Sequence, residues 1–118
     1  MFLIFEEYPD AIASLQQEIL KIDTLLDFCY IQQSEITHSI DKEIAFDKSY
    51  TNENQRKTAR NEKLKIDADY QKNLQEINNF TTKRKAAEIH LEKRKNEFSV
   101  LKLNERRRLY ELHQLMSE

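Results

Sequence analysis

The amino-acid sequence predicts an all-α protein built on a long antiparallel helical hairpin of the coiled-coil type. Three observations support this fold class. The 118 residues include no glycine and one proline, whereas nucleotide-binding loops and most hairpin-rich β folds need glycine at positive φ. Apolar residues recur at alternating spacings of three and four, which is the period of a coiled-coil seam. The two halves of the chain carry opposite net charge, −7 over residues 1–50 and +5 over residues 51–118, so two helices lying side by side would attract each other.

The first helix is expected from about residue 9 to residue 46, within a single helical domain that spans residues 1–118. Pro9 and Asp10 suit a first helical turn, because proline has no amide hydrogen to leave unpaired and a carboxylate faces the positive end of the helix dipole. The expected role of Cys29 is that of a small buried hydrophobe on the seam. This half of the hairpin seam consists of Ile12, Leu15, Ile19, Ile22, Leu26, Cys29, Ile36 and Ile40.

A turn is expected over about residues 47–51, where the apolar pattern lapses into polar residues. Thr51 or Asn52 can cap the next helix, and the spacing from Asn52 to Gln55 resembles a capping box. The second helix is then expected from about residue 52 to residue 116. Its apolar contribution to the hairpin seam is Ile66, Tyr70, Ile77, Phe80 and Leu91, and polar residues such as Asn73 and Arg84 fall in the same frame.

An alternative is a break near residues 78–82, where four poor helix formers surround Phe80. Such a break would produce a three-helix bundle. A helix that started at residue 81 or 82 would, however, place the basic triplet of residues 83–85 in its first turn, where the helix dipole disfavours cations. One continuous second helix is therefore favoured.

The unequal lengths of the two expected helices favour self-association. At about 1.5 Å per residue they would be about 57 and 98 Å long, so about 27 residues at the end of the second helix would lack a partner in the same chain. Residues 19–31 are also apolar nearly all round, although a two-helix seam covers one stripe. We expect a symmetric homodimer with an interface formed by Phe98, Leu101, Leu109, Leu112, Leu115 and Met116.

Three basic clusters lie in the second half of the chain and could contact the phosphates of a nucleic acid. They consist of Lys83, Arg84, Lys85, Lys93, Arg94, Lys95, Arg106, Arg107 and Arg108. Pairs at i, i+4 point instead to a solvated helix face; examples are Lys63 with Asp67, Arg84 with Glu88, and Lys93 with Glu97. The clusters also spiral around a helix instead of forming one stripe. Contact with nucleic acid is therefore an alternative that is not favoured.

The sequence contains no arrangement typical of an enzyme or a metal site. The three histidines, His38, His90 and His113, lack the partners at i+3 or i+4 that would gather metal ligands on one helix face. We expect no catalytic residues, no cofactor and no metal. The apolar run at the N-terminus is far shorter than the ~20 residues of a membrane span. With a single cysteine, the chain is expected to be cytoplasmic and to have no membrane partner.

A resemblance to a group of known proteins rests on scattered segments that cover about half of the chain. They are Thr51-Asn52-Glu53, Gln55-Arg56-Lys57, Asp67, Tyr70-Gln71, Ala87-Glu88-Ile89, Leu91-Glu92 and Phe98-Ser99-Val100-Leu101-Lys102-Leu103. In these segments the chain resembles small all-helical proteins of unassigned role that phages and other mobile elements encode, often near recombination genes. The resemblance implies an accessory role in DNA maintenance or recombination, through the bridging of partner proteins, and assigns no functional residue.

The sequence thus predicts a non-enzymatic coiled-coil protein that self-associates and scaffolds an unidentified protein partner. The alternative is a nucleic-acid-binding accessory protein of a phage or mobile element that uses the basic second half of the chain.

Overall fold

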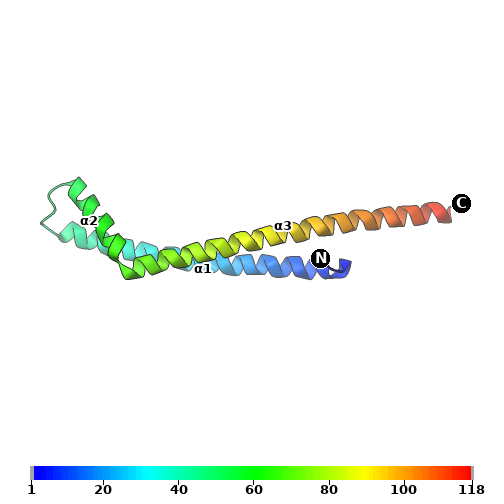
Figure 1. Cartoon of the computed structure of the whole chain (residues 1–118), viewed down its shortest axis with the longest axis horizontal. Coiled ribbons are helices and arrows are strands. Elements are labelled where there is room, and N and C mark those ends of the chain that lie inside the picture. The colour runs from blue at the N-terminus through cyan, green and yellow to red at the C-terminus, as the bar shows by residue number, and fades with distance from the viewer. Residues whose placement is uncertain (1, 118) are drawn as a thin grey trace. The chain divides into compact units, whose positions relative to one another are not determined.

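The computed structural model describes residues 2–117, which form three α-helices and one short 3-10 turn (Figure 1). The 3-10 turn spans Phe5–Glu7, α1 spans Tyr8–Phe46, α2 spans Glu53–Ile66 and α3 spans Ala68–Met116. The described residues contain no β-strand, so the predicted all-α fold class is confirmed. Within residues 2–117, every helix falls short of the length and apolar character that crossing a bilayer requires.

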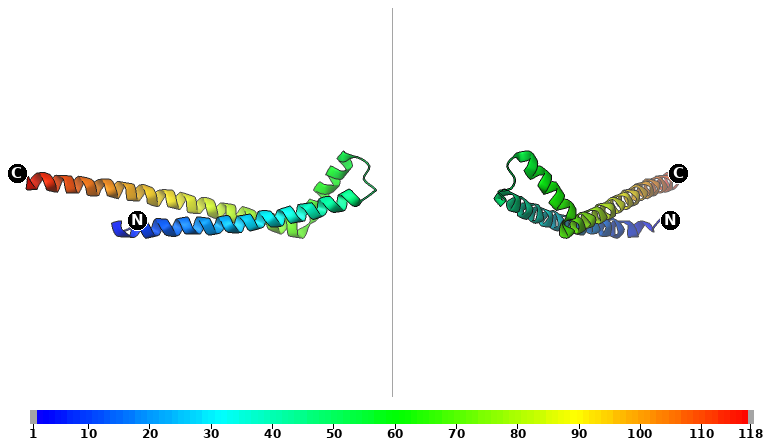
Figure 2. Two further views of the ribbon diagram at one scale, coloured as in Figure 1. Left: turned by 180° about the vertical axis from the view of Figure 1, so that it is seen from behind. Right: turned by 60° about the vertical axis from the view of Figure 1, so that its left-hand side comes forward.

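The chain divides into two compact units, and α1 and α3 each run through both of them. The terminal unit combines residues 1–21 with residues 84–118, and the central unit consists of residues 22–83. In each unit, a segment of α1 and a segment of α3 lie side by side and run in opposite directions (Figures 1 and 2). This is the local geometry of the predicted antiparallel hairpin.

The core of the central unit consists of two apolar clusters. In the first, Ile22, Leu26 and Cys29 of α1 pack with Ile77 of α3. The partly buried Phe80 packs against the edge of this cluster. In the second, Ile40 and Ile44 of α1 pack with Ala59 and Leu64 of α2, and three half-buried residues surround them: Ile36, Tyr50 and Tyr70. Residues 22–29 of α1 thus pack against residue 77 of α3, whereas residues 40–44 pack against residues 59–64 of α2. The packed segments therefore run antiparallel along the seam.

Most of the predicted seam residues are buried or half-buried, as the apolar spacing predicts. Leu15, Ile22, Leu26, Cys29, Ile40 and Ile77 are buried, and Ile12, Ile19, Ile36, Tyr70, Phe80 and Leu91 are half-buried. The assignment of Ile66 to the seam is wrong, because its side chain is 83% exposed. Leu64, two residues earlier, is buried in its place.

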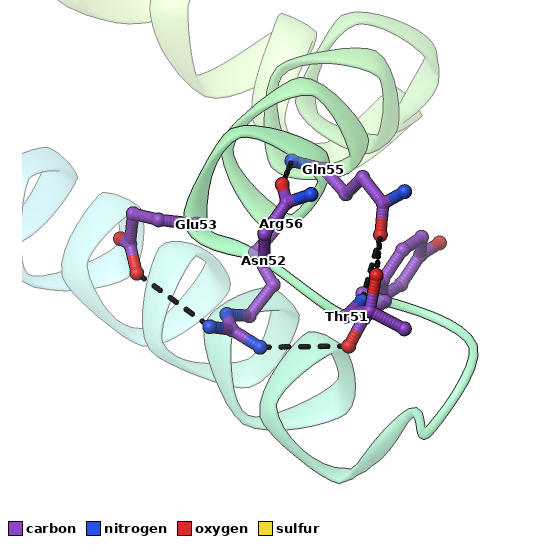
Figure 3. A network of polar contacts seen from close by, with 6 residues as sticks. Thr51, Asn52, Glu53, Gln55 and Arg56 are labelled. Carbon is purple, nitrogen blue, oxygen red and sulfur yellow. Dashed lines mark hydrogen bonds and ion pairs between the residues drawn. The ribbon is translucent and has the colours of Figure 1, made fainter.

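The predicted ends of the first helix and the predicted cap of the next one are confirmed. Helix α1 begins at Tyr8, one residue before Pro9, and ends at Phe46. Asn52 caps α2: its side chain accepts a hydrogen bond from the Gln55 amide at 2.9 Å. The Gln55 side chain in turn accepts bonds from the amide and hydroxyl of Thr51 at 2.7 and 2.9 Å. Figure 3 shows this reciprocal capping arrangement, which satisfies amides that the start of a helix leaves unpaired.

The prediction of one continuous helix over residues 52–116 is wrong. The chain leaves the helical conformation at Asp67, where φ is −71° and ψ is 115°. Asp67 then caps α3, because its carboxylate accepts a hydrogen bond from the Tyr70 amide at 2.8 Å. The alternative break near residues 78–82 is also wrong, because α3 is continuous there. The sequence around Asp67 carries a start signal that the apolar spacing concealed, namely an aspartate cap followed by Asp69 in the first turn.

Two ion pairs connect the acidic α1 to the basic α2 in the central unit. Arg60 Nε lies 2.6 Å from Asp41 Oδ1, and Lys63 Nζ lies 2.7 Å from Glu43 Oε1. The hydrogen bond to Glu43 raises the pKa of Lys63. The expected pairing of Lys63 with Asp67 is therefore wrong, because Lys63 reaches across to α1 and Asp67 serves as a cap.

Candidate functional site

An aromatic cluster joins the start of α1 to the C-terminal half of α3 in the terminal unit. Tyr8 is fully buried, and its ring stacks on that of Phe98 with a centroid distance of 5.4 Å and an interplanar angle of 8°. Phe5 packs on the same ring at 5.3 Å. Lys102 Nζ lies 4.6 Å from the Phe98 ring centroid, within the range of a cation–π interaction.

Polar groups around the Tyr8 hydroxyl hold this cluster together. The hydroxyl accepts a hydrogen bond from the Leu3 amide at 3.1 Å and donates to Glu97 Oε1 at 3.5 Å. The guanidinium of Arg94 lies 3.0 Å from the same oxygen of Glu97. Glu97 is buried, so the cation compensates a carboxylate that would otherwise be costly to remove from water.

Phe98, which the sequence predicted for a homodimer interface, packs instead against Phe5 and Tyr8 of the same chain and is half-buried. Leu101 is half-buried as well. The ring of Phe98 is covered because the N-terminal residues pack on α3, a contact that the apolar spacing did not predict. Tyr8 did carry a signal, since it lies four residues before Ile12 and so extends the spacing of the seam backwards by one step.

The other four residues predicted for the homodimer interface are exposed, and they form what we call the C-terminal stripe. Its members are Leu109, Leu112, Leu115 and Met116. They recur at helical spacing on the side of α3 that also presents Phe98. Within the terminal unit, α3 continues past the point where α1 begins, as both figures of the whole chain show (Figures 1 and 2). The face of α3 that packs on Tyr8 thus continues toward the C-terminus as a solvent-exposed apolar surface.

The three basic clusters are partly neutralised by acidic neighbours. Arg84 pairs with Glu88, as the spacing predicted, Arg94 pairs with Glu97, and Arg108 Nη2 lies 2.7 Å from Glu105 Oε1. The expected pair of Lys93 with Glu97 is replaced by Arg94, which reaches the same carboxylate. Lys83 lies with its Nζ 5.9 Å from the Phe80 ring. The other cluster members are exposed: Lys85, Lys93, Lys95, Arg106 and Arg107.

A polar pair interrupts the apolar seam of the central unit. Asn73 is 4% exposed, and its Nδ2 donates a hydrogen bond to the Cys29 carbonyl at 2.8 Å. Its Oδ1 is buried and has no hydrogen-bond partner among the described residues. The Cys29 thiol donates weakly to Glu76 at 3.9 Å. Burial raises the pKa of this thiol, and the nearby charge of Glu76 adds to the shift, so the nucleophilic thiolate is disfavoured.

Comparisons with known protein families, with curated proteins and with solved structures gave no match. Across residues 2–117, the structure brings together no group of three or more histidine, cysteine, aspartate or glutamate side chains able to hold a metal ion. His38, His90 and His113 are exposed. The C-terminal stripe is therefore the candidate site that the geometry defines best.

Proposed function

We propose that this chain is a non-enzymatic assembly protein that forms a homodimer through the C-terminal stripe and scaffolds a protein partner. The single observation that carries the proposal is the exposure of Leu109, Leu112, Leu115 and Met116 on one side of α3. Contiguous apolar surface of this kind marks interaction sites in soluble proteins. The unpaired thiol of Cys29 suits a reducing compartment such as the cytoplasm.

Burial of the stripe would contribute favourable free energy to a contact. A leucine side chain that is fully removed from water contributes about 1.5–3 kcal/mol. Leu112 is 48% exposed and Leu115 is 73% exposed, so each has roughly half or more of that contribution still to gain. A symmetric dimer would bury the stripe of both chains, which doubles the gain for one loss of translational and rotational freedom.

The nucleophilic and acidic side chains that could act in catalysis serve in packing, capping and ion pairing. Cys29 is buried in the seam, with a pKa raised away from the reactive thiolate. Asp67 accepts the amide of Tyr70 at the start of α3, and Glu97 is paired with Arg94. These roles favour a structural function over a catalytic one.

The test is the mass of the purified chain in solution. The wild-type chain should scatter light as a dimer, and Leu112→Asp with Leu115→Asp should scatter as a monomer, because two buried carboxylates would oppose association. The matched control is Tyr110→Asp with Gln114→Asp, which places the same charges on the exposed opposite side of α3 and should leave a dimer. A wild-type chain that is monomeric at about 100 µM, a weak affinity for a protein dimer, would refute the proposal.

A second candidate function rests on the exposed basic residues of α3. Arg106 and Arg107 are accessible to solvent, so an accessory protein of a phage or mobile element could use them to contact nucleic-acid phosphates. This function predicts salt-dependent binding of duplex or single-stranded DNA that weakens in Arg106→Ala with Arg107→Ala. If no shift appears in a gel at low salt, the second candidate is excluded.

A further inference from the structure

The central unit exposes a second apolar surface, on the side of α1 that faces away from the seam. Phe28 is 59% exposed and Ile31 is 58% exposed. On a helix, Ile31 lies about 200° around from Cys29, which is buried in the seam. We call Phe28 and Ile31, with the acidic residues Asp27 and Glu35 that flank them, the outer α1 stripe.

Shallow hollows lie on both sides of this stripe. One is lined by Phe28 and Glu35 and continues to α3, where Asp69, Lys72, Asn73 and Glu76 line it. The other is lined by Asp27, Ile31 and Glu35, together with Tyr30, Ser34 and His38. The outer α1 stripe is therefore a ridge of two large apolar side chains between concave and predominantly acidic flanks, which is a shape that a second helix can pack against.

The C-terminal stripe has the features that such a helix would need. Leu112 and Leu115 are three residues apart, as are Phe28 and Ile31, so the two pairs match in spacing whether the helices run parallel or antiparallel. Three arginines, residues 106–108, immediately precede the C-terminal stripe, and Arg108 is paired with Glu105. Basic residues beside one stripe and acidic residues beside the other are complementary, and such complementarity selects the partner and the register of a helix pair.

We propose that the occupant of the outer α1 stripe is the C-terminal stripe of a second copy of this chain. This inference rests on the proposed self-association and specifies where the C-terminal stripe binds. A parallel contact between two C-terminal stripes would instead bring two arginine clusters together, which like-charge repulsion disfavours. Docking on α1 places the arginines near Asp27 and Glu35.

The first test compares two aromatic residues of α1 by sedimentation equilibrium of the full-length chain. Phe28→Asp should weaken dimerisation by roughly tenfold or more, because it removes a large apolar contact from the interface. The matched control is Phe46→Asp, since Phe46 is 76% exposed and lies about 27 Å along α1 from Phe28, outside both hollows. The control should change the dissociation constant by no more than about twofold, and far-UV circular dichroism should show the same helicity for all three chains.

The second test reverses charge and then restores complementarity. Asp27→Lys with Glu35→Lys should weaken dimerisation roughly tenfold, and so should Arg106→Glu with Arg108→Glu. An equimolar mixture of the two variants should associate to within about threefold of wild type, because each C-terminal stripe again meets an outer α1 stripe of opposite charge. Contact between two C-terminal stripes predicts that the first variant dimerises like wild type.

The outcomes separate this inference from the proposed function. A monomeric wild-type chain would overturn both. A dimer that Leu112→Asp with Leu115→Asp dissociates, but that Phe28→Asp and the Asp27 and Glu35 reversals leave intact, would overturn the inference and keep the proposed self-association. Weakened dimerisation in the α1 variants, with recovery in the mixture, would support both.

Discussion

Replacing the buried Asn73 by leucine should stabilise this protein. The Asn73 side chain makes one hydrogen bond, from Nδ2 to the Cys29 carbonyl at 2.8 Å. That carbonyl lies in the middle of α1, where the amide four residues later also donates to it. The substitution therefore removes one donor and leaves no carbonyl without a partner.

The expected magnitude follows from three contributions. Loss of the hydrogen bond costs about 1 kcal/mol of net stability, and removal of the unpartnered buried Oδ1 returns about 1–3 kcal/mol. Placing an apolar side chain at a position that is 4% exposed adds about 1–2 kcal/mol, less any strain from the branched leucine. The free energy of unfolding should rise by about 1–4 kcal/mol in Asn73→Leu, less the strain. Asn73→Ala also removes Oδ1 but leaves a gap, so it should be less stable than Asn73→Leu by about 1–2 kcal/mol.

Urea unfolding followed by far-UV circular dichroism measures these changes, at one protein concentration because association shifts the midpoint. A second readout is the specificity of association, since a polar residue in a seam fixes register at the expense of stability. Asn73→Leu should therefore populate additional oligomers in light scattering. If Asn73→Leu were less stable than wild type, the hydrogen bond to Cys29 would outweigh the buried oxygen, and the reasoning would be wrong.

Three further predictions concern the cap, the aromatic cluster and the thiol. Asp67→Ala should lower the free energy of unfolding by about 1 kcal/mol, and Asp67→Asn should largely preserve it, as measured in urea, because the amide side chain can still accept the Tyr70 amide. Phe98→Ala should lower it by about 2 kcal/mol while the mass in light scattering stays unchanged, because the ring packs within its own chain; a loss of dimer would contradict this. The Cys29 thiol, with its pKa raised by burial, should react with a disulfide reagent roughly 100-fold more slowly at pH 8 in the native chain than in 8 M urea, and comparable rates would show that the seam opens readily.

The same pKa shift gives a pH dependence of stability with a definite sign. The pKa of Cys29 is higher in the folded chain than in an unfolded one, so the folded state prefers the protonated thiol. The stability that depends on this proton is fully present below the unfolded thiol pKa and is lost as the pH rises from there through the folded value. Cys29→Ala should remove that alkaline loss, which urea unfolding at pH 7 and pH 10 can measure.

The sequence by itself determined the fold class, the seam of α1 and the cap of α2. The absence of glycine and the alternating apolar spacing left helices as the stable option, because each helix must bury one stripe. The end of α1 at Phe46 and the Asn52 cap were visible because they depend on residues that are neighbours in the chain. Local signals of this kind need no tertiary information.

Only the tertiary structure decided where the second helix breaks and which apolar residues stay in water. The Asp67 break could not be read from the spacing, because an aspartate in a long polar stretch suits a helix surface as well as a cap. Phe98 and Leu112 belong to the same apolar pattern, but the ring of Tyr8 covers one and leaves the other exposed. Periodicity shows which side of a helix is apolar, whereas burial depends on which distant segment reaches that side, and this is a property of the folded chain.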